Sequence, residues 1–272
     1  MNTLWLSALA ILLYLLASAG FLRQLQYNLT INDQQPYRKQ LLGLVFVAII
    51  LHTASLWPQL MTSQGLNLGF FNAISLVALL TMLIFFLSSL TLPVDILGIP
   101  LLSVAAVAVA LNAFYPDQQR ILSGNDWKLD LHILFSILAY SILGLGAAQA
   151  SLLAIQERHL RNRRPGGFIR ALPPLEIMES LLFEMISIGF ILLSAALLTG
   201  ILFIDNIFAQ HLVHKSVLSF IAWGVFAILL WGRWKFGWRG RTAIRWTLTG
   251  FAFLLLAYFG SKFVLELILE KT

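Results

Sequence analysis

A long apolar segment, Trp127–Arg164, reads WKLDLHILFSILAYSILGLGAAQASLLAIQERHLRNRR. Its uninterrupted part, residues 131–155, exceeds the roughly 20 residues with which a helix crosses the hydrocarbon of a bilayer. One histidine, His132, stands near its start, and a dense run of arginines follows its end. Because arginine and lysine collect on the cytoplasmic side of a membrane, the segment is predicted to be a transmembrane helix with His132 at the outer face.

The composition of the whole chain favours the same environment. Of the 272 residues, 59% are hydrophobic and 11% are charged, whereas a soluble protein carries roughly 25% charged residues. The chain has no cysteine, which excludes disulfides, thiolate metal ligands and CxxC redox chemistry. Its net charge of +6 is explained by basic cytoplasmic loops. We therefore expect the lipid bilayer, and no nucleic acid, as a partner.

Eight segments are long and apolar enough to span a membrane, and no soluble domain fits between them. The first has no basic start and stays apolar to Leu22, which favours a retained span over a signal peptide. The fold class predicted is an all-α, polytopic helix bundle that forms one integral-membrane domain, residues 1–272. The predicted spans are 3–22, 40–60, 69–90, 94–115, 131–155, 182–204, 216–232 and 246–268.

Basic residues orient these spans. With the N-terminus outside, the inner connections hold thirteen of the 18 lysines and arginines. The other five are Arg120, Lys128, Lys215, Lys262 and Lys271. This asymmetry predicts that both termini lie on the periplasmic side of a bacterial inner membrane. The prediction depends on a tight turn at SSLTLPVD, residues 88–95, between the third and fourth spans.

His52 lies inside the second span, in FVAIILHTASLWPQL, toward the predicted outer side. An ionisable residue at that depth is costly and should face the interior of the bundle. One interpretation is a neutral histidine that is hydrogen-bonded to a neighbouring helix. The other is an axial ligand or a proton relay, since neutral imidazole is a common axial ligand of haem iron.

Two further histidines lie at the predicted outer face. His132 shares a helix face with Ser136 and Tyr140, and it is either a marker of the headgroup level or a ligand. His214 follows His211 in the connection DNIFAQHLVHKSV, but two histidines do not make a zinc site, so no metal site is predicted. His214 could instead supply one ligand opposite His132, with His52 somewhat deeper.

The remaining polar features carry no catalytic signature. The sequence holds no nucleotide-binding glycine loop, no HExxH and no arrangement that indicates a nucleophile, so the chain is not expected to be an enzyme. The segment LLWGRWKFGWRGRTAIRW, residues 229–246, combines tryptophans with basic residues. It is typical of an inner-surface anchor with affinity for anionic lipid, and a docking surface for a partner is the alternative.

Three segments resemble a known family: LHILFSILAYSILGLGAAQASLLAIQERHLR, LLTGILFIDNIFAQHLVHKSVLSFIAWGVFAILLWGRWKFGWRGRTAIRW and LLLAYFGSKFVLELIL. They look like the integral-membrane cytochrome c assembly proteins, and within them the small bacterial inner-membrane branch of YpjD and HemX type. The resemblance covers essentially the whole chain. It implies an eight-span bundle that handles haem on histidines near the outer face, and the matching positions here are His132 and His52.

The chain departs from that family pattern at two places. Where the resemblance implies a tryptophan-rich signature, residues 205–219 read DNIFAQHLVHKSVLS. Where it implies a histidine before an arginine, the chain has Gly232 before Arg233.

Three functions follow as hypotheses. The first is a haem-binding or haem-transferring membrane protein that uses His132 with His52 or His214. The second is a non-haem membrane accessory or transporter-like protein on the same scaffold, connected with divalent cations. The third is a structural partner of other membrane proteins, docked through the arginine–tryptophan segment.

Overall fold

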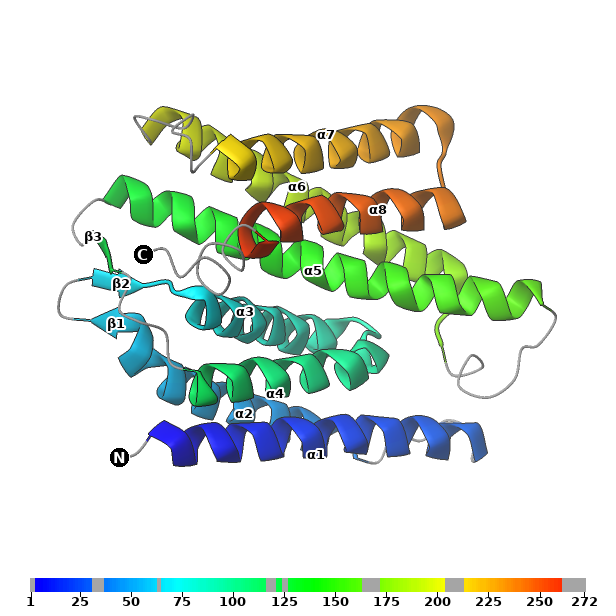
Figure 1. Ribbon diagram of the computed structural model, residues 1–272. Helices are drawn as coiled ribbons and strands as arrows, with labels where there is room; N and C mark the ends of the chain where they lie inside the picture. The colour runs from blue at the N-terminus through cyan, green and yellow to red at the C-terminus, as the bar shows by residue number, and fades with distance from the viewer. Residues whose placement is uncertain are drawn as a thin grey trace. The chain divides into compact units, whose positions relative to one another are not determined.

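The computed structural model describes residues 3–30, 37–62, 65–115, 121–123, 127–162, 172–203 and 213–260. Within this part of the chain, eight helices are long and apolar enough to cross a membrane (Figure 1). The predicted all-α, polytopic architecture is thereby confirmed, while the side on which the termini lie stays a prediction.

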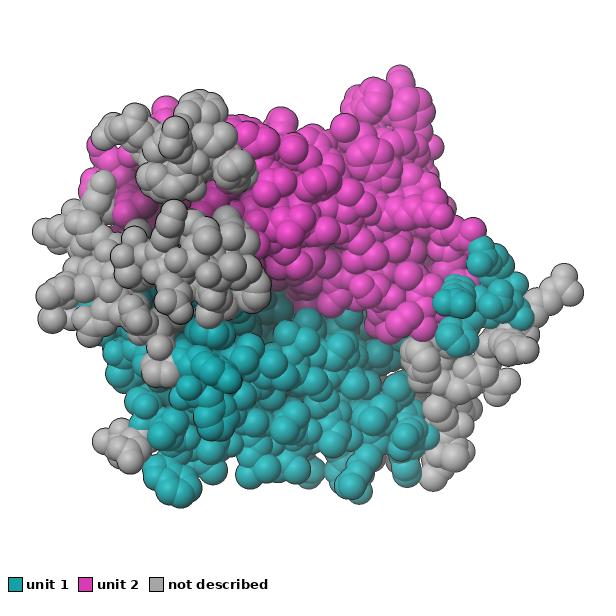
Figure 2. Space-filling view, in the orientation of Figure 1, with its two compact units in different colours: residues 1–125, 158–174 teal, residues 126–157, 175–272 magenta. Residues whose placement is uncertain are grey.

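Contacts between residues divide the chain into two compact units, which Figure 2 colours separately. Unit 1 comprises residues 1–125 and 158–174, and unit 2 comprises residues 126–157 and 175–272. The prediction of one integral-membrane domain stays a prediction, and each unit is described by itself.

Unit 1 contains four membrane-length helices: α1 (Thr3–Thr30), α2 (Arg38–Leu60), α3 (Phe70–Thr91) and α4 (Gly98–Phe114). α2 packs on α1 and α3, and α4 packs on the same two helices. Tyr14, Phe85 and Leu102 are fully buried between them. Other large apolar side chains stay exposed, such as Val104 at 63% and Phe114 at 75%, as expected of surfaces that face lipid.

Three short strands connect helix ends in unit 1: β1 (Met61–Thr62), β2 (Gly65–Asn67) and β3 (Ile121–Ser123). They form an antiparallel sheet in the order β1-β2-β3, with Leu66 opposite both Met61 and Leu122. These strands carry no signal in the sequence, because two or three residues are too few to show an alternating pattern.

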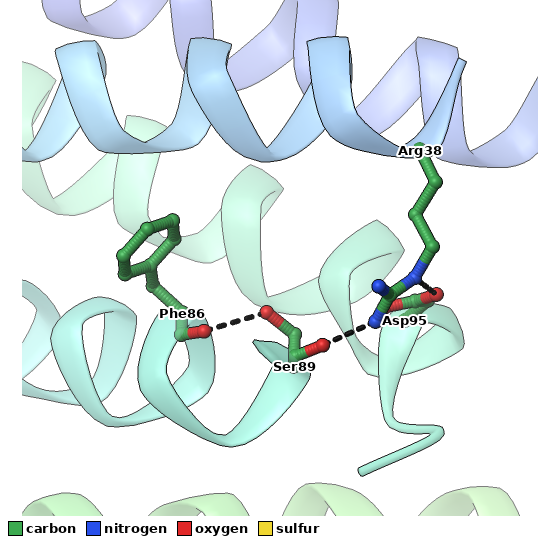
Figure 3. Close-up of polar contacts among 4 residues, drawn as sticks. All are labelled: Arg38, Phe86, Ser89 and Asp95. Atoms are coloured by element: carbon green, nitrogen blue, oxygen red, sulfur yellow. Dashed lines mark hydrogen bonds and ion pairs between the residues drawn. The ribbon is translucent and has the colours of Figure 1, made fainter. Parts of the chain in front are cut away.

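The predicted tight turn between the third and fourth spans is present. α3 ends at Thr91, and a 3₁₀ helix, η1 (Asp95–Leu97), leads directly into α4. Arg38, the first residue of α2, reaches this turn: its Nε lies 2.6 Å from Asp95 Oδ2 and its Nη2 lies 3.1 Å from Asp95 Oδ1 (Figure 3). The same Nη2 donates to the carbonyl oxygen of Ser89 in the last turn of α3. One guanidinium therefore ties together one end of three helices.

Unit 2 contains α5 (Trp127–Arg161), α6 (Leu175–Phe203), α7 (Val213–Phe236) and α8 (Gly240–Leu255), and α8 continues as a π-helix, η3 (Leu256–Gly260). Small residues allow close packing: a Cβ on Gly189 would lie 2.6 Å from Leu143 Cδ2, and one on Gly250 would lie 2.9 Å from Phe226 Cζ. Where α8 becomes π-helical, Tyr140 Oη donates to the carbonyl oxygen of Leu254 across 2.6 Å.

Several helices are longer than the predicted spans. α1 continues to Thr30 rather than residue 22, α5 covers 127–161 rather than 131–155, and α6 begins at Leu175 rather than 182. The apolar run marks only the part of a helix that lies in hydrocarbon. Polar turns can extend a helix beyond that part, because lipid headgroups and water form hydrogen bonds with their polar groups.

Replacing Arg38 by Gln should destabilise unit 1. The substitution removes the cationic partner of Asp95, a carboxylate that is only 16% exposed. It also removes the donor to the carbonyl oxygen of Ser89. We expect the free energy of unfolding to fall by roughly 1–3 kcal/mol, measured as a lower melting temperature in detergent. Lys39→Gln, at the exposed neighbouring residue, is the matched control; equal melting temperatures for the two variants would contradict the role of Arg38.

Reporter fusions test the predicted orientation. Alkaline phosphatase is active only outside the cytoplasm, so a fusion after residue 118 should be active and one after residue 165 inactive. Green fluorescent protein at the same positions should give the opposite pattern. An active phosphatase after residue 165 would reverse the orientation and place His132 on the cytoplasmic side.

Candidate functional site

His132 lies in the second turn of α5 and contacts α6. Its Nδ1 is 2.9 Å from the carbonyl oxygen of Ala196. A carbonyl oxygen only accepts, so Nδ1 carries the proton. In the neutral ring, Nε2 then holds a free lone pair. The fold thus selects the tautomer in which Nε2 can act as a ligand.

The polypeptide around His132 fixes the plane of the ring. Thr199 Oγ1 lies 3.5 Å from Nδ1 and is itself bonded to the carbonyl oxygens of Ala195 and Ala196. On Gly200, a Cβ would lie 3.1 Å from His132 Cε1 and 3.3 Å from Nδ1, which is tighter than ordinary contact. One turn of α6 therefore provides both the hydrogen-bond acceptor and the space for the imidazole.

This arrangement resembles that of histidines that bind metals in proteins. Such histidines usually donate the second ring N–H to a carbonyl or a carboxylate, which sets the ring orientation and makes the ligating nitrogen more basic. His132 is half-buried, so its ring is neither fully exposed nor enclosed.

His52 is fully buried between three helices of unit 1. Tyr14 Oη from α1 lies 3.2 Å from Nδ1, and Ser75 Oγ from α3 lies 2.9 Å from Nε2. Because both hydroxyls can donate or accept, either tautomer of His52 is satisfied. The geometry agrees with the interpretation of a hydrogen-bonded core histidine. To bind a metal, His52 would first have to release one of these two hydroxyls.

The other predicted ligands are placed as follows. His214 is the second residue of α7, but its side chain and all of His211 lie outside the described residues. His52 belongs to unit 1 and His132 to unit 2, so their use as a pair stays a prediction. Among the described residues, no group of three histidines or carboxylates has the arrangement of a metal site.

The space beside Gly232, where a side chain at that position would lie, is occupied by the indole of Trp238. A Cβ there would lie 2.4 Å from Trp238 Cε3, so no larger side chain fits while Trp238 keeps its place. Arg233 Nη1 donates to the carbonyl oxygen of Trp238 across 3.1 Å, and Gly237 has φ of 66°, which glycine adopts without strain. The turn from α7 to α8 is thus folded over the site where the family resemblance implies a histidine.

The sequence predicted a hydrogen bond from His52 to a neighbouring helix but not the residues that form it, and it indicated no partner for the ring of His132. Tyr14 and Ser75 gave only a weak signal, as single polar residues in apolar spans at a depth similar to that of His52. Ala196 contributes a backbone carbonyl, which no side-chain pattern can indicate. Gly200 was identifiable only as a small residue near the end of its span.

The fold and these sites define a polytopic α-helical membrane protein whose polar groups are buried between helices. The family described as "Cytochrome C assembly protein" matches residues 41–269, and the chain belongs to this family. Membership supports a role related to cytochrome c biogenesis. The proteins of this family are generally not enzymes, and the expectation that this chain is not one stays a prediction.

Three relatives illustrate the range of similarity. The chain is 30% identical over 240 residues to inner membrane protein YpjD of Escherichia coli K12. The aligned region covers 85% of this chain and 89% of that protein. It is 23% identical to protein HemX of Brevibacillus brevis, with 94% of each chain covered. It is 26% identical to cytochrome c biogenesis protein CcsA of Prochlorococcus marinus MIT 9515, with 64% and 62% covered.

No solved structure matches the chain. Together with the eight membrane-length helices, the relatives agree with the predicted multi-pass protein of the bacterial inner membrane.

Gly200→Val should displace the ring of His132. The added side chain would meet the imidazole, which cannot move without weakening its bond to Ala196. We expect a destabilisation of roughly 1–3 kcal/mol, seen as a lower melting temperature. The control is Gly224→Ala, because a Cβ at Gly224 meets nothing within 4 Å and a helical alanine is favoured over glycine. Unchanged melting for Gly200→Val would show that the ring is not held as described.

Proposed function

We propose that this protein binds haem, or passes it on, at the predicted periplasmic face during cytochrome c assembly. His132 is the first ligand, through Nε2, and His214 or His52 supplies the second. The observation that carries the proposal is the bond from His132 Nδ1 to the carbonyl of Ala196, which leaves Nε2 unprotonated in the neutral ring. Family membership adds independent support.

The two candidates for the second haem ligand, His214 and His52, differ in what haem binding would require of the protein. His214 is the second residue of α7 and its side chain lies outside the described residues, so its use as a ligand rests on its place in the sequence. His52 would have to exchange its bond to Tyr14 or Ser75 for iron. If His52 is the ligand, haem binding is coupled to a rearrangement among α1, α2 and α3.

Two observations favour a second candidate, a non-haem membrane accessory or transporter-like protein on the same scaffold. Both ring nitrogens of His52 already have partners. In addition, Trp238 fills the space at Gly232. If this second candidate moves divalent cations, the described residues contain no group of three histidines or carboxylates that would bind one.

The absorption spectrum of the purified protein, oxidised and reduced, separates the two candidates. Protein expressed in haem-replete cells should show a Soret band that shifts on reduction. His132→Ala should lower haem occupancy by about tenfold or more, since loss even of a residue that supports a metal ligand costs roughly 10–100-fold. His159→Ala, at the other end of α5, is the matched control.

Rescue sharpens the assignment of His132. In His132→Gly, added imidazole should restore the spectrum, because a free imidazole can replace the deleted ring. A wild-type protein without a Soret band would favour the non-haem candidate. A bound-haem spectrum that is unchanged in His132→Ala would show that another residue holds the iron.

A further inference from the structure

A cavity of about 460 Å³ opens at the arginine-rich end of unit 2. The end of α5, the start of α6 and the turn from α7 into α8 contribute to its lining. Its volume lies within the range of roughly 300–1,000 Å³ that is usual for small-molecule sites. Two carboxylates, two guanidiniums and apolar side chains share its lining: Glu157, Glu179, Arg239, Arg241, Leu153 and Leu175.

The two guanidiniums keep donors for an anion. Arg241 Nε donates to Glu157 Oε1 across 3.0 Å, which uses one of its five N–H groups. Arg239 Nε lies 3.9 Å from Glu179 Oε2, which is beyond hydrogen-bond distance. Within the described part of the chain, the terminal nitrogens of both side chains have no further partner. Forked guanidinium donors of this kind match the oxygens of a phosphate.

The two carboxylates keep acceptors for a cation. Glu179 Oε1 accepts the backbone N–H of Gly240 across 2.7 Å, and its side chain is only 14% exposed. Glu157 is 28% exposed and accepts from Arg241 through Oε1. Among the described residues, Oε2 of either carboxylate accepts no hydrogen bond. Both side chains therefore retain an oxygen that a primary ammonium could use.

The charges of the cavity select the ligand class. Two carboxylates and two guanidiniums balance, so a purely anionic ligand meets repulsion from the glutamates and a purely cationic one meets repulsion from the arginines. The ring centroids of Trp238 and Trp246 lie 5.6 Å apart beside this turn, which is typical of the membrane interface. We propose that the cavity binds a phosphate joined to a primary ammonium, the headgroup of phosphatidylethanolamine.

A lipid titration of the full-length protein in detergent tests this proposal. The probes are dihexanoyl phosphatidylethanolamine, phosphatidylcholine and phosphatidylglycerol, with binding counted by native mass spectrometry. We expect the ethanolamine lipid to bind about tenfold more tightly than the other two, since choline has no N–H to donate and glycerol has no positive charge. Equal affinity for the three lipids overturns the proposal.

Soluble phosphoethanolamine separates the two sources of the same chemistry. It should bind more weakly than the lipid, because Leu153 and Leu175 offer apolar surface to the glycerol and acyl part. Equal binding of the two probes would retain the chemistry of the site and overturn the lipid as its source.

Substitutions assign the two halves of the headgroup. Arg239→Gln removes no side-chain hydrogen bond to any described residue and should weaken the binding of all three lipids by about tenfold. Glu157→Gln can still accept from Arg241 and should abolish only the preference for ethanolamine. Arg245→Gln, on α8 but outside the cavity lining, is the matched control for lost charge. Unchanged lipid preference in Glu157→Gln, with an unchanged melting temperature, would overturn the assignment of the ammonium.

Discussion

The constraint on which this structure depends is the lack of water in the hydrocarbon core, where every polar group must find a partner within the protein. Membrane-length helices satisfy the backbone, many serine and threonine hydroxyls donate to carbonyls of their own helix, and several other polar side chains pair across helices. His52 joins Tyr14 and Ser75, Tyr140 reaches the carbonyl of Leu254, and Gln149 donates to the carbonyl of Met178. The same requirement gives His132 its tautomer, because a backbone carbonyl is the group that meets Nδ1.

The two histidines in the transmembrane helices show that burial alone does not indicate function. His52 is the more deeply buried, yet both of its nitrogens are used within the fold. His132 is less buried and has one nitrogen committed to a carbonyl that cannot donate in return. What distinguishes a potential ligand is therefore the chemistry of its neighbours: hydroxyls satisfy either tautomer, whereas a carbonyl selects one.

Length, hydropathy and the tight turn at Pro93 were enough to predict eight spanning helices from the sequence. The helix ends were not, since polar turns of α1, α5 and α6 continue beyond the apolar runs. Of the candidate site, the sequence indicated His132 and His52, but it could not indicate the acceptor at Ala196, which is a backbone atom. The strands β1 to β3 are too short for a period, and the filling of Gly232 by Trp238 depends on a turn that only the folded chain makes.

The packing of Trp238 against Gly232 also bears on how this chain can change during evolution. Any residue with a side chain at position 232 meets the indole, and loss of the indole leaves a void beside a glycine. Each of the two residues is therefore compatible with a stable fold only when the other is present. A histidine could occupy position 232 only after Trp238 had been replaced or displaced, and the single substitution of Trp238 would first leave that void. The turn between α7 and α8 therefore couples positions 232 and 238, so that a change at either one requires a change at the other.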